Sequence, residues 1–314
     1  MELDNTKTDL RKLFEEFVDE CKYSRGLRLP TINAYIAVFS HFSKIMPEID
    51  KVEILTRPML NEFFKRIKTR TRIVGRNTPK VGLEDSTVKT YSRKLNAFFV
   101  WLVQRKLMIE NPLNGITLKN PEYKDQRALT DEEVRKILTA VNMYSKNSLF
   151  LRRDTVMLYL LFFCGLRAGE FISLRVIDID MEKRILTVRA ETSKSKKTRY
   201  LTMHPTLIFH LREYINERNK LGYKTEHLFV STSGDRGLTR HGLKHWVKRL
   251  IKLSGVKFHL HRFRHSFACN LAKNNTPIVM IQKLMGHSDI KMTMSYLRSI
   301  TCEDATAYMD RLSI

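Results

Sequence analysis

The 314-residue sequence lacks a CxxC pair, an apolar leader and any apolar run long enough to span a bilayer. Its four cysteines are scattered, so we expect no disulfide framework and a reducing, cytoplasmic location. The most apolar stretch, residues 155–166, is short and predicts a buried helix, and the acidic start differs from a signal peptide. Glycine and proline are scarce as well, with 12 and 8 residues, which is typical of a folded chain. We expect no membrane attachment.

Acidic residues are also few, since 33 aspartates and glutamates stand against 56 lysines and arginines, a formal net charge of +23 at pH 7. This excess favours a polyanionic partner; an anionic membrane surface and an unpartnered basic surface are the alternatives. Residues 1–120 carry 22 basic and 14 acidic residues, and residues 121–314 carry 34 and 19. Because both halves are basic, we expect two domains that clamp one polyanion.

The periodicity of apolar residues divides the chain. Amphipathic stripes at residues 9–23, 31–45, 57–68 and 86–106 predict a helical bundle over residues 1–118. The periodicity is then lost, which predicts a linker at 119–128. Residues 129–314 begin with a helix start at Thr130 and Glu133, and they mix further helices with strands at 184–191 and 199–204. The predicted fold is mainly α with a small β-sheet, in the α+β class.

One stretch of the first domain, KRIKTRTRIVGR at residues 65–76, has no acidic residue. We expect it to be a loop that lies on phosphates, with a solvated charge run as the alternative. Its basic residues are Lys65, Arg66, Lys68, Arg70, Arg72 and Arg76.

The string HLHRFRHSFA at residues 259–268 gathers histidines and arginines. A metal site is disfavoured, because Arg262 and Arg264 stand between His261 and His265 and no acidic residue or cysteine lies nearby to complete a ligand set. A cluster of this composition instead suits an anion. His259 fits a surface or supporting role better than a catalytic one.

Two further segments supply matching parts. In CGLRAGEFISL, Arg167 follows a buried helix and therefore needs an anion or an acid, and Glu170 is the nearest acid. In GHSDIKMTMSYLR, His287 follows a glycine and Tyr296 stands nine residues later. Taken singly, these two residues are also compatible with a helix cap and a core tyrosine.

Together the segments GLRAGEF, HRFRH, MGH and SY resemble, in order and spacing, the motifs of the tyrosine recombinase (phage integrase) family, including its Xer-type members. The resemblance implies a helical core-binding domain of SAM-like type followed by a catalytic domain. The family's hairpin lysine corresponds to Lys194 in SKSKKTR, with Lys196 as the other candidate. Lys196, Lys197 and Arg199 of the same segment are expected to contact DNA.

The resemblance also implies a reaction, the transesterification of a DNA phosphodiester with neither metal nor cofactor. Arg167 and Arg264 would donate paired hydrogen bonds to the non-bridging phosphate oxygens. Tyr296 would attack the phosphorus and form a 3′-phosphotyrosine, with His261 as the proton acceptor. His287 would hydrogen-bond a phosphate oxygen.

Supporting roles follow from the same resemblance. Lys194 would protonate the departing 5′-hydroxyl, Glu170 would orient Arg167, and His265 would support the motif rather than touch DNA. The tail carries an amphipathic stripe at Ala305, Tyr308, Met309 and Leu312. In this family such tails dock on a neighbouring protomer, whereas a tail folded back on its own domain is the alternative.

The function expected from the resemblance is site-specific recombination by a tetramer on two duplexes that carry inverted-repeat sites, at the nucleoid and with a possible accessory protein. Chromosome dimer resolution and integration or excision of a mobile element both fit this chemistry. The alternatives are a type IB topoisomerase that relaxes supercoils as a monomer and a catalytically silent DNA-binding accessory protein. The sequence does not specify the target DNA.

Overall fold

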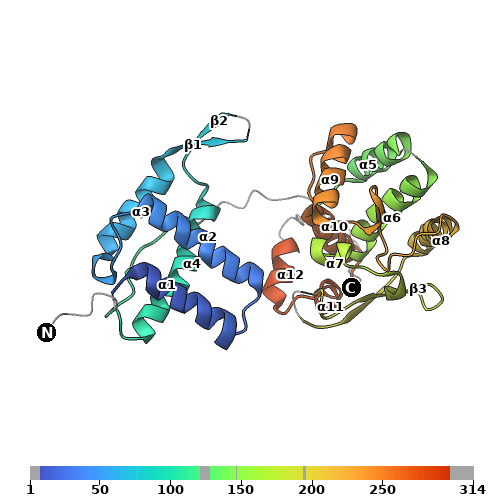
Figure 1. The fold of residues 1–314 in the computed structure, drawn as a ribbon. Coiled ribbons are helices and arrows are strands. Elements are labelled where there is room, and N and C mark those ends of the chain that lie inside the picture. The colour runs from blue at the N-terminus through green and yellow to red at the C-terminus, as the bar shows by residue number, and fades with distance from the viewer. Residues whose placement is uncertain (1–7, 76, 121–127, 146, 194–195, 298–314) are drawn as a thin grey trace, which may run out of the picture. The chain divides into compact units, whose positions relative to one another are not determined.

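Four α-helices form the bundle of the first unit, Met1–Tyr123, within its described residues. They are α1 (Leu10–Asp19), α2 (Leu29–Ile45), α3 (Arg57–Thr69) and α4 (Asp85–Gln104), drawn in blue to blue-green in Figure 1. The computed structural model describes residues 8–75, 77–120, 128–145, 147–193 and 196–297. The second unit is Lys124–Ile314, so the division between the units falls inside the predicted linker at 119–128.

Aromatic side chains fill the core of this bundle. Phe14 of α1 and Phe39 of α2 stack with their ring centroids 3.8 Å apart, and Phe98 of α4 meets both rings edge-on. Phe63 of α3 joins the core through an edge contact with Phe42, at 5.0 Å between centroids. All four helices therefore bury their apolar stripes against one another, as the periodicity predicts.

A carboxylate ties the end of α1 to the end of α4. Glu20 lies in a π-helical turn that continues α1, and it accepts hydrogen bonds from Trp101 Nε1 (2.7 Å), Arg105 (2.7 Å) and Arg25 (2.7 Å). These bonds, that of Trp101 first, lower the pKa of Glu20 from 4.5 to about 2. The carboxylate thus stays ionised and bridges the two helices across the pH range in which the protein is expected to work.

Residues 65–76 do not form the predicted loop. The stretch begins in the last turns of α3 and continues as β1 (Thr71–Val74), which pairs antiparallel with β2 (Thr78–Val81). Gly82 closes the hairpin with φ +67°, and a Cβ there would stand 2.2 Å from the Lys68 carbonyl oxygen. The sequence pattern missed the hairpin because its strands are short and almost wholly exposed, so they show no alternation of apolar residues.

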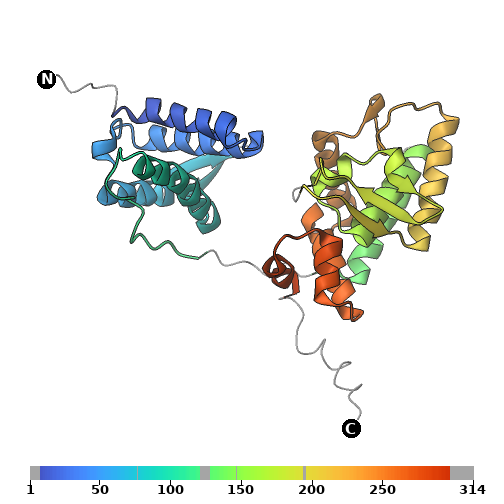
Figure 2. The same ribbon diagram turned by 90° about the horizontal axis from the view of Figure 1, so that it is seen from below.

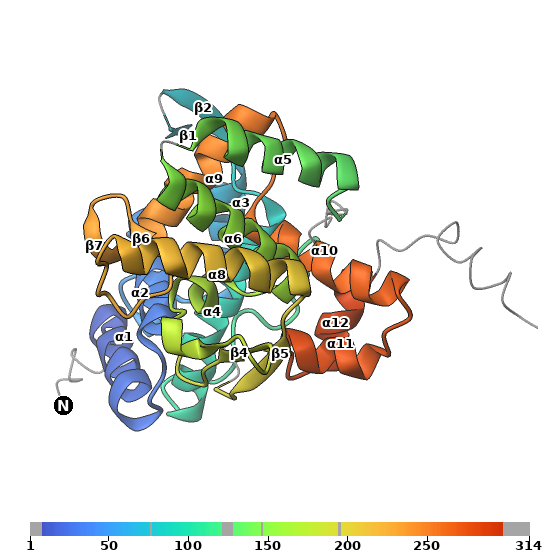
Figure 3. The same cartoon turned by 90° about the vertical axis from the view of Figure 1, so that its right-hand side faces the viewer.

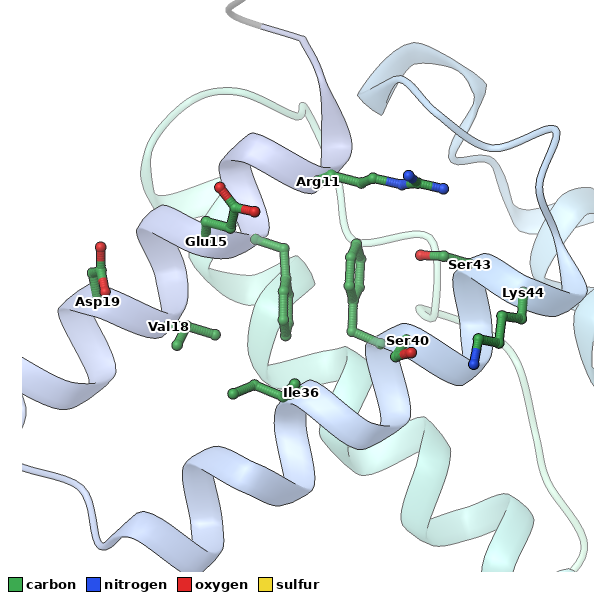
Figure 4. Close-up of a pocket in the computed structure, with 10 residues that line it drawn as sticks. Arg11, Glu15, Val18, Asp19, Ile36, Ser40, Ser43 and Lys44 are labelled. Atoms are coloured by element: carbon green, nitrogen blue, oxygen red, sulfur yellow. The ribbon is translucent and has the colours of Figure 1, made fainter.

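A cavity of about 660 Å³ opens between α1 and α2 (Figure 4). Its lining includes the stacked Phe14 and Phe39. Charged side chains such as Glu15 and Lys44 also line it. The lining contains no histidine, cysteine or tyrosine. Its polar lining consists of Ser40, Ser43 and charged side chains, and it includes none of the predicted catalytic residues, which all belong to the second unit.

The second unit surrounds a small sheet with helices. The sheet has the order β3-β4-β5 and is antiparallel throughout. Its buried side chains pack on α6 and α8, and Figure 2 shows α8 beside the strands. The strands are β3 (Ile179–Asp180), β4 (Ile185–Val188) and β5 (Arg199–Thr202), with β6 (Val230–Ser231) and β7 (Gly234–Gly237) as a separate hairpin.

The helices of the second unit agree with the predicted α+β class. Thr130 and Glu133 form the predicted capping box before α5. Helices α10, α11 and α12 contact one another at one end of the unit, as Figure 3 shows. The set is α5 (Asp131–Tyr144), α6 (Ser148–Cys164), α7 (Ala168–Ile172), α8 (Pro205–Lys220), α9 (Arg240–Ser254), α10 (Leu260–Lys273), α11 (Ile278–Met285) and α12 (Ile290–Leu297).

Helix α6 is the buried helix predicted at residues 155–166, and within the described ranges no helix is long and apolar enough to cross a membrane. Its one buried acid, Asp154, is fully enclosed at 0% exposure and accepts hydrogen bonds from Arg153 (2.7 Å) and from Arg249 of α9 (2.7 Å). Arg153 also donates to the carbonyl of Val230 at 2.8 Å. This ionic cluster joins α6, α9 and the β6-β7 hairpin.

We expect Asp154→Asn to lower the free energy of unfolding by about 3–5 kcal/mol, because it leaves two arginines without a buried anion. The matched control is Asp180→Asn, which removes a carboxylate paired with Lys183 at 3.4 Å on the surface and should cost less than about 1 kcal/mol. Urea unfolding of the full chain measures both. Equal losses in the two variants would contradict the structural role of Asp154.

Candidate active site

The site begins where α6 ends. Gly165 terminates α6 in the left-handed conformation (φ 54°), and a Cβ there would stand 2.3 Å from the ring of Phe267. Glycine is therefore required at this turn on two grounds. The turn brings Arg167 to the start of α7, with its side chain 21% exposed. The arginine predicted for the end of a buried helix thus reaches the surface there.

Arg264 of α10 lies beneath this turn. Its residue exposure is 1%, and its guanidinium donates to the carbonyls of Gly165 (2.6 Å) and Met285 (2.5 Å). It also donates to Nε2 of His287, at 2.9 Å. One buried cation therefore holds together the end of α6, the end of α11 and the histidine that follows α11.

His287 is fixed on both ring nitrogens. A guanidinium can only donate, so Nε2 accepts from Arg264 and the ring proton lies on Nδ1. This Nδ1–H donates to Oγ1 of Thr293 at 2.9 Å, a fully buried hydroxyl of α12. Gly286, with φ +62°, makes the turn that places the histidine here. The predicted alternative of a simple helix cap does not account for these two contacts.

A buried carboxylate joins Arg167 to Arg199. Glu170 is 2% exposed; it accepts from Nη1 of Arg167 at 3.0 Å and from both terminal nitrogens of Arg199 at 3.0 and 2.8 Å. Burial raises the pKa of Glu170, but the hydrogen bonds and charge of Arg199, followed by those of Arg167, outweigh it and lower the pKa to about 2. Glu170 thus contacts both the amide and the guanidinium of Arg167, and its expected role in orienting Arg167 stays a prediction.

Arg199 itself corrects a prediction. It was expected to contact DNA, but its side chain is 8% exposed and Nε donates to the Leu284 carbonyl at 3.0 Å, while Nη1 and Nη2 hold Glu170. The residue is thus a structural link between β5, α7 and α11. A signal for this role was present in the sequence, because Arg199 shares the inward phase of β5 with Leu201.

His261 lies one turn before Arg264 on α10, and it is exposed. Protein that displaces water from around its ring, and then the charge of Arg264, lower the pKa of His261 from 6.5 to about 4. The same two causes lower the pKa of His287 to about 3. Arg167 contributes to both shifts, so the four side chains share one electrostatic environment. Both imidazoles are neutral at pH 7.

Three other polar residues of the stretch 259–268, His259, Arg262 and His265, make contacts within the protein. His259 is the N-cap of α10 and accepts from the Arg262 amide at 3.2 Å. His265 is 7% exposed, and its Nε2 lies 3.6 Å from Sγ of Cys269. Arg262 pairs with Glu133 at 2.7 Å and thereby fixes the start of α5 to α10. Only part of the predicted anion cluster, His261 and Arg264, therefore belongs to the site.

Two predicted catalytic residues are described incompletely or not at all. Tyr296 lies on α12, the helix that follows His287 and contacts α10, but its side chain is outside the described residues. Lys194 is likewise outside them. Of the neighbouring lysines, Lys196 and Lys197 are both exposed. The stripe of the tail, Ala305 to Leu312, and Arg76 also lie outside the described ranges.

The basic residues of the first unit differ in their partners. Lys65, Arg66 and Lys68 pair with carboxylates, the shortest contacts being 3.9 Å to Glu62, 2.8 Å to Glu48 and 3.0 Å to Asp85, respectively. Arg72 donates to the Gly82 carbonyl at 3.1 Å, and Arg70 lies 2.6 Å from Nε2 of His41. The charge of this stretch is thus partly compensated within the protein.

A second basic surface, which we did not predict from the sequence, lies on α9. Helix α9 has no acidic residue, and its buried face is formed by Leu243, Trp246 and Leu250. The opposite face exposes Arg240, His241, Lys244, His245 and Lys248. A Cβ on Gly169 of α7 would lie 3.5 Å from Arg240, so this basic face starts beside the site. In RHGLKHWVKRL, apolar residues recur at helical spacing among basic ones, and this pattern could have predicted the basic face.

Two arginines beside two neutral histidines can bind an anion and accept a proton. An enzyme that acts on a phosphodiester needs both abilities. In the part of the chain that the structure describes, no group of three or more histidine, cysteine or acidic side chains could hold a metal ion.

Residues 127–301 match the model of the phage integrase family, and the chain belongs to this family. It is 28% identical over 289 residues to a tyrosine recombinase of Thermosipho africanus, covering 91% of this chain and 94% of the relative. It is 29% identical over 295 residues to the tyrosine recombinase XerD of Listeria monocytogenes, with the same coverage of both chains. The chain is therefore an enzyme of the tyrosine-type site-specific DNA recombinases.

Solved structures share the fold. The Tn1549 transposon integrase in complex with a circular intermediate DNA superposes with a TM-score of 0.77 at 20% identity, covering 98% of this chain and 100% of that chain. The XerH recombinase bound to a palindromic difH substrate gives 0.70 at 22% identity, covering 92% and 82%. These similarities confirm the predicted fold of helices with small sheets.

We expect Arg199→Met to lower the free energy of unfolding at pH 7 by about 3–5 kcal/mol, because the buried Glu170 loses its bidentate partner. In the native protein the pKa of Glu170, about 2, lies below its ordinary 4.5. Its stabilising effect is therefore complete above pH 4.5 and is lost as the pH falls towards 2. The difference between wild type and variant should thus be smaller at pH 4 than at pH 7.

Denaturant unfolding at the two pH values measures this difference. The double variant Glu170→Gln/Arg199→Met should be more stable than the sum of the two single losses predicts, because no unpaired buried charge remains. If the losses of the two single variants add up in the double variant and are equal at both pH values, the ionic interaction between Arg199 and Glu170 does not stabilise the fold.

Proposed function

We propose that this enzyme cuts and rejoins DNA strands through a 3′-phosphotyrosine on Tyr296 and acts as a tetramer on two duplexes. The observation that carries the proposal is the convergence of Arg167, Arg264, His261 and His287, with Tyr296 on the next helix. A phosphodiester is anionic, so a nucleophile can approach its phosphorus only where that charge is offset.

The two arginines divide this task. Arg167, whose side chain reaches solvent, hydrogen-bonds a non-bridging oxygen of the phosphate, and Glu170 keeps its fork in position. Arg264 supplies positive charge from below and holds His287, which faces the same phosphate. His287 and His261 are neutral before DNA binds, so the site can take up the anion and a proton together.

The reaction then proceeds by in-line displacement. His261 takes the phenolic proton of Tyr296, the phenolate oxygen bonds to phosphorus, and the bond from phosphorus to the 5′-oxygen breaks. Lys194 gives its proton to the departing 5′-oxygen. The reverse steps, with a 5′-hydroxyl from a second duplex as the nucleophile, rejoin the strand. No external energy source is required, because the phosphotyrosine retains the ester bond.

Double-stranded DNA with inverted-repeat sites is the proposed partner. Its phosphates meet the basic residues of both units, including Arg72 on the β1-β2 hairpin, Lys196 and Lys197 after Lys194, and the exposed face of α9. With six to ten phosphate contacts, affinity should fall about 10³- to 10⁵-fold between 50 and 200 mM salt. Such a substrate would place the enzyme at the nucleoid.

Subunit assembly is proposed to use the tail. A pocket of about 570 Å³ lies between α6, β5, α10 and α11, lined by apolar side chains including Phe163, Phe267 and Leu271. The amphipathic stripe of the tail matches this lining in character, and the tail of a neighbouring protomer is its proposed occupant. Names of the relatives and neighbours, Xer recombinases and a transposon integrase, support chromosome dimer resolution or mobile-element integration and excision as the role.

Tyr296→Phe should abolish the covalent product on nicked duplexes that carry the recombination site, without weakening DNA binding, because only the nucleophilic oxygen is removed. A denaturing gel detects the protein–DNA band.

Lys194→Ala should slow cleavage by at least about 10²-fold if this lysine is the general acid, whereas Lys196→Ala should change it little. A covalent band from Tyr296→Phe, or a normal rate for Lys194→Ala with a slow Lys196→Ala, would overturn the corresponding assignment.

Leu271→Arg in the pocket should prevent the joining of two duplexes while single duplexes are still bound, because it puts a charge where an apolar tail would dock. The matched control is Val279→Arg on α11, a residue that is 52% exposed and lies outside the pocket lining. Mass photometry of the DNA complexes measures the number of subunits. Tetramers that form normally with Leu271→Arg would contradict docking at this pocket.

A further inference from the structure

Arg70 differs from its neighbours in the basic stretch of the first unit, residues 65–76. It caps the end of α3 where β1 begins, and its backbone is fixed by bonds from its amide to Arg66 (3.0 Å) and from Gly82 to its carbonyl (2.9 Å). Among the described residues, no carboxylate lies within ion-pair distance of its guanidinium. Its Nε is buried and has no hydrogen-bond partner there. Arg70 is thus a half-buried cation whose charge the protein leaves uncompensated.

A histidine holds this cation in place. Nη2 of Arg70 lies 2.6 Å from Nε2 of His41, a residue of α2. A guanidinium cannot accept a hydrogen bond, so Nε2 must be the acceptor and the ring proton lies on Nδ1. Nδ1 lies 3.2 Å from the hydroxyl of Tyr91 on α4 and donates to it. The chain of contacts therefore runs from Arg70 through His41 to Tyr91.

The direction of this chain has a chemical consequence. Because the Tyr91 oxygen accepts from His41, the phenolic proton remains available to another acceptor. Burial first, then the charges of Arg70 and Lys44, lower the pKa of His41 below 6.5, so the ring is neutral at pH 7 and keeps its acceptor. Arg70 and Tyr91 both present donors next to one rigid imidazole. Two fixed donors with an uncompensated positive charge suit a tetrahedral oxyanion.

We propose that Arg70, oriented by His41 and accompanied by Tyr91, forms a binding site for one DNA backbone phosphate on the first unit. His41 is a positioning residue, since it acts through Arg70. The inference rests on the proposed function, because DNA supplies the phosphate. It separates Arg70 from its neighbours Arg66 and Lys68, whose charges are already paired with carboxylates. The basic stretch thus contacts DNA at selected residues and not along its whole length.

The salt dependence of DNA binding tests this site. Each neutralised phosphate contributes about 0.9 to the slope of log affinity against log salt concentration. Arg70→Gln in the full-length protein should therefore lower the slope by about 0.9 and weaken binding to any duplex sequence. The matched control is Arg66→Gln, which removes an equal charge that is paired with Glu48 and Glu62 and should leave the slope near that of wild type. Fluorescence anisotropy with a labelled duplex between 50 and 200 mM salt gives the slopes.

Histidine variants test the positioning role. His41→Leu should lower the slope as Arg70→Gln does, and the double variant should bind no more weakly than Arg70→Gln alone, since both changes disable one contact. His41→Gln offers an amide oxygen to Arg70 and should retain most of the affinity. If His41→Leu fails to fold by circular dichroism, the comparison of His41→Gln with Arg70→Gln decides. Additive losses in the double variant would overturn the role of His41.

The outcomes separate this inference from the proposed function. A wild-type protein that binds duplex with a steep salt slope, while Arg70→Gln matches Arg66→Gln, would refute the phosphate site and leave the recombinase proposal intact. A wild-type protein that neither binds duplex nor forms a covalent product would refute the proposed function itself.

Discussion

The buried carboxylate of Glu170 is the constraint on which the active site depends. It accepts four hydrogen bonds, from the amide and guanidinium of Arg167 and from two nitrogens of Arg199. Through Arg199 the same carboxylate is linked to the Leu284 carbonyl on α11, just before His287. A buried anion needs partners to offset its desolvation, and the partners here come from the start of α7 and from β5. The fold thereby fixes Arg167 and His287 relative to each other.

Positive charge is concentrated at the site before any substrate is present. Arg264 is buried and bonded to two carbonyls. Both nearby histidines remain neutral because burial first, and then the charge of Arg264, lower their pKa values. A bound phosphate would offset the repulsion between these positive charges, which favours binding of the anionic substrate over binding of water. Preorganisation of this kind places the cost of gathering the cations in the folding of the protein and not in the reaction.

Much of this arrangement could be predicted from local sequence. Arg167, His261, Arg264 and His287 stand in motifs that resemble, in order and spacing, those of the phage integrase family, and this resemblance selected the four residues. Arg199 was misjudged because it follows several lysines in one basic turn, and only the inward phase of β5 distinguishes it from them. The side-chain contacts that we infer to position Arg70 involve His41, 29 residues before Arg70, and Tyr91, 50 residues after His41. Such long-range contacts leave no local pattern.

We propose that Tyr296 carries the covalent bond to DNA, and mass spectrometry of the trapped complex can identify the bonded residue. Digestion with trypsin after Lys291 and Arg298 and with a nuclease leaves the peptide MTMSYLR, residues 292–298, in which Tyr296 is the one tyrosine. We expect a 3′-phosphonucleotide on this peptide, with fragment ions that assign the added mass to Tyr296. A phosphonucleotide on Ser295, on Thr293 or on a different peptide would show that Tyr296 is not the nucleophile.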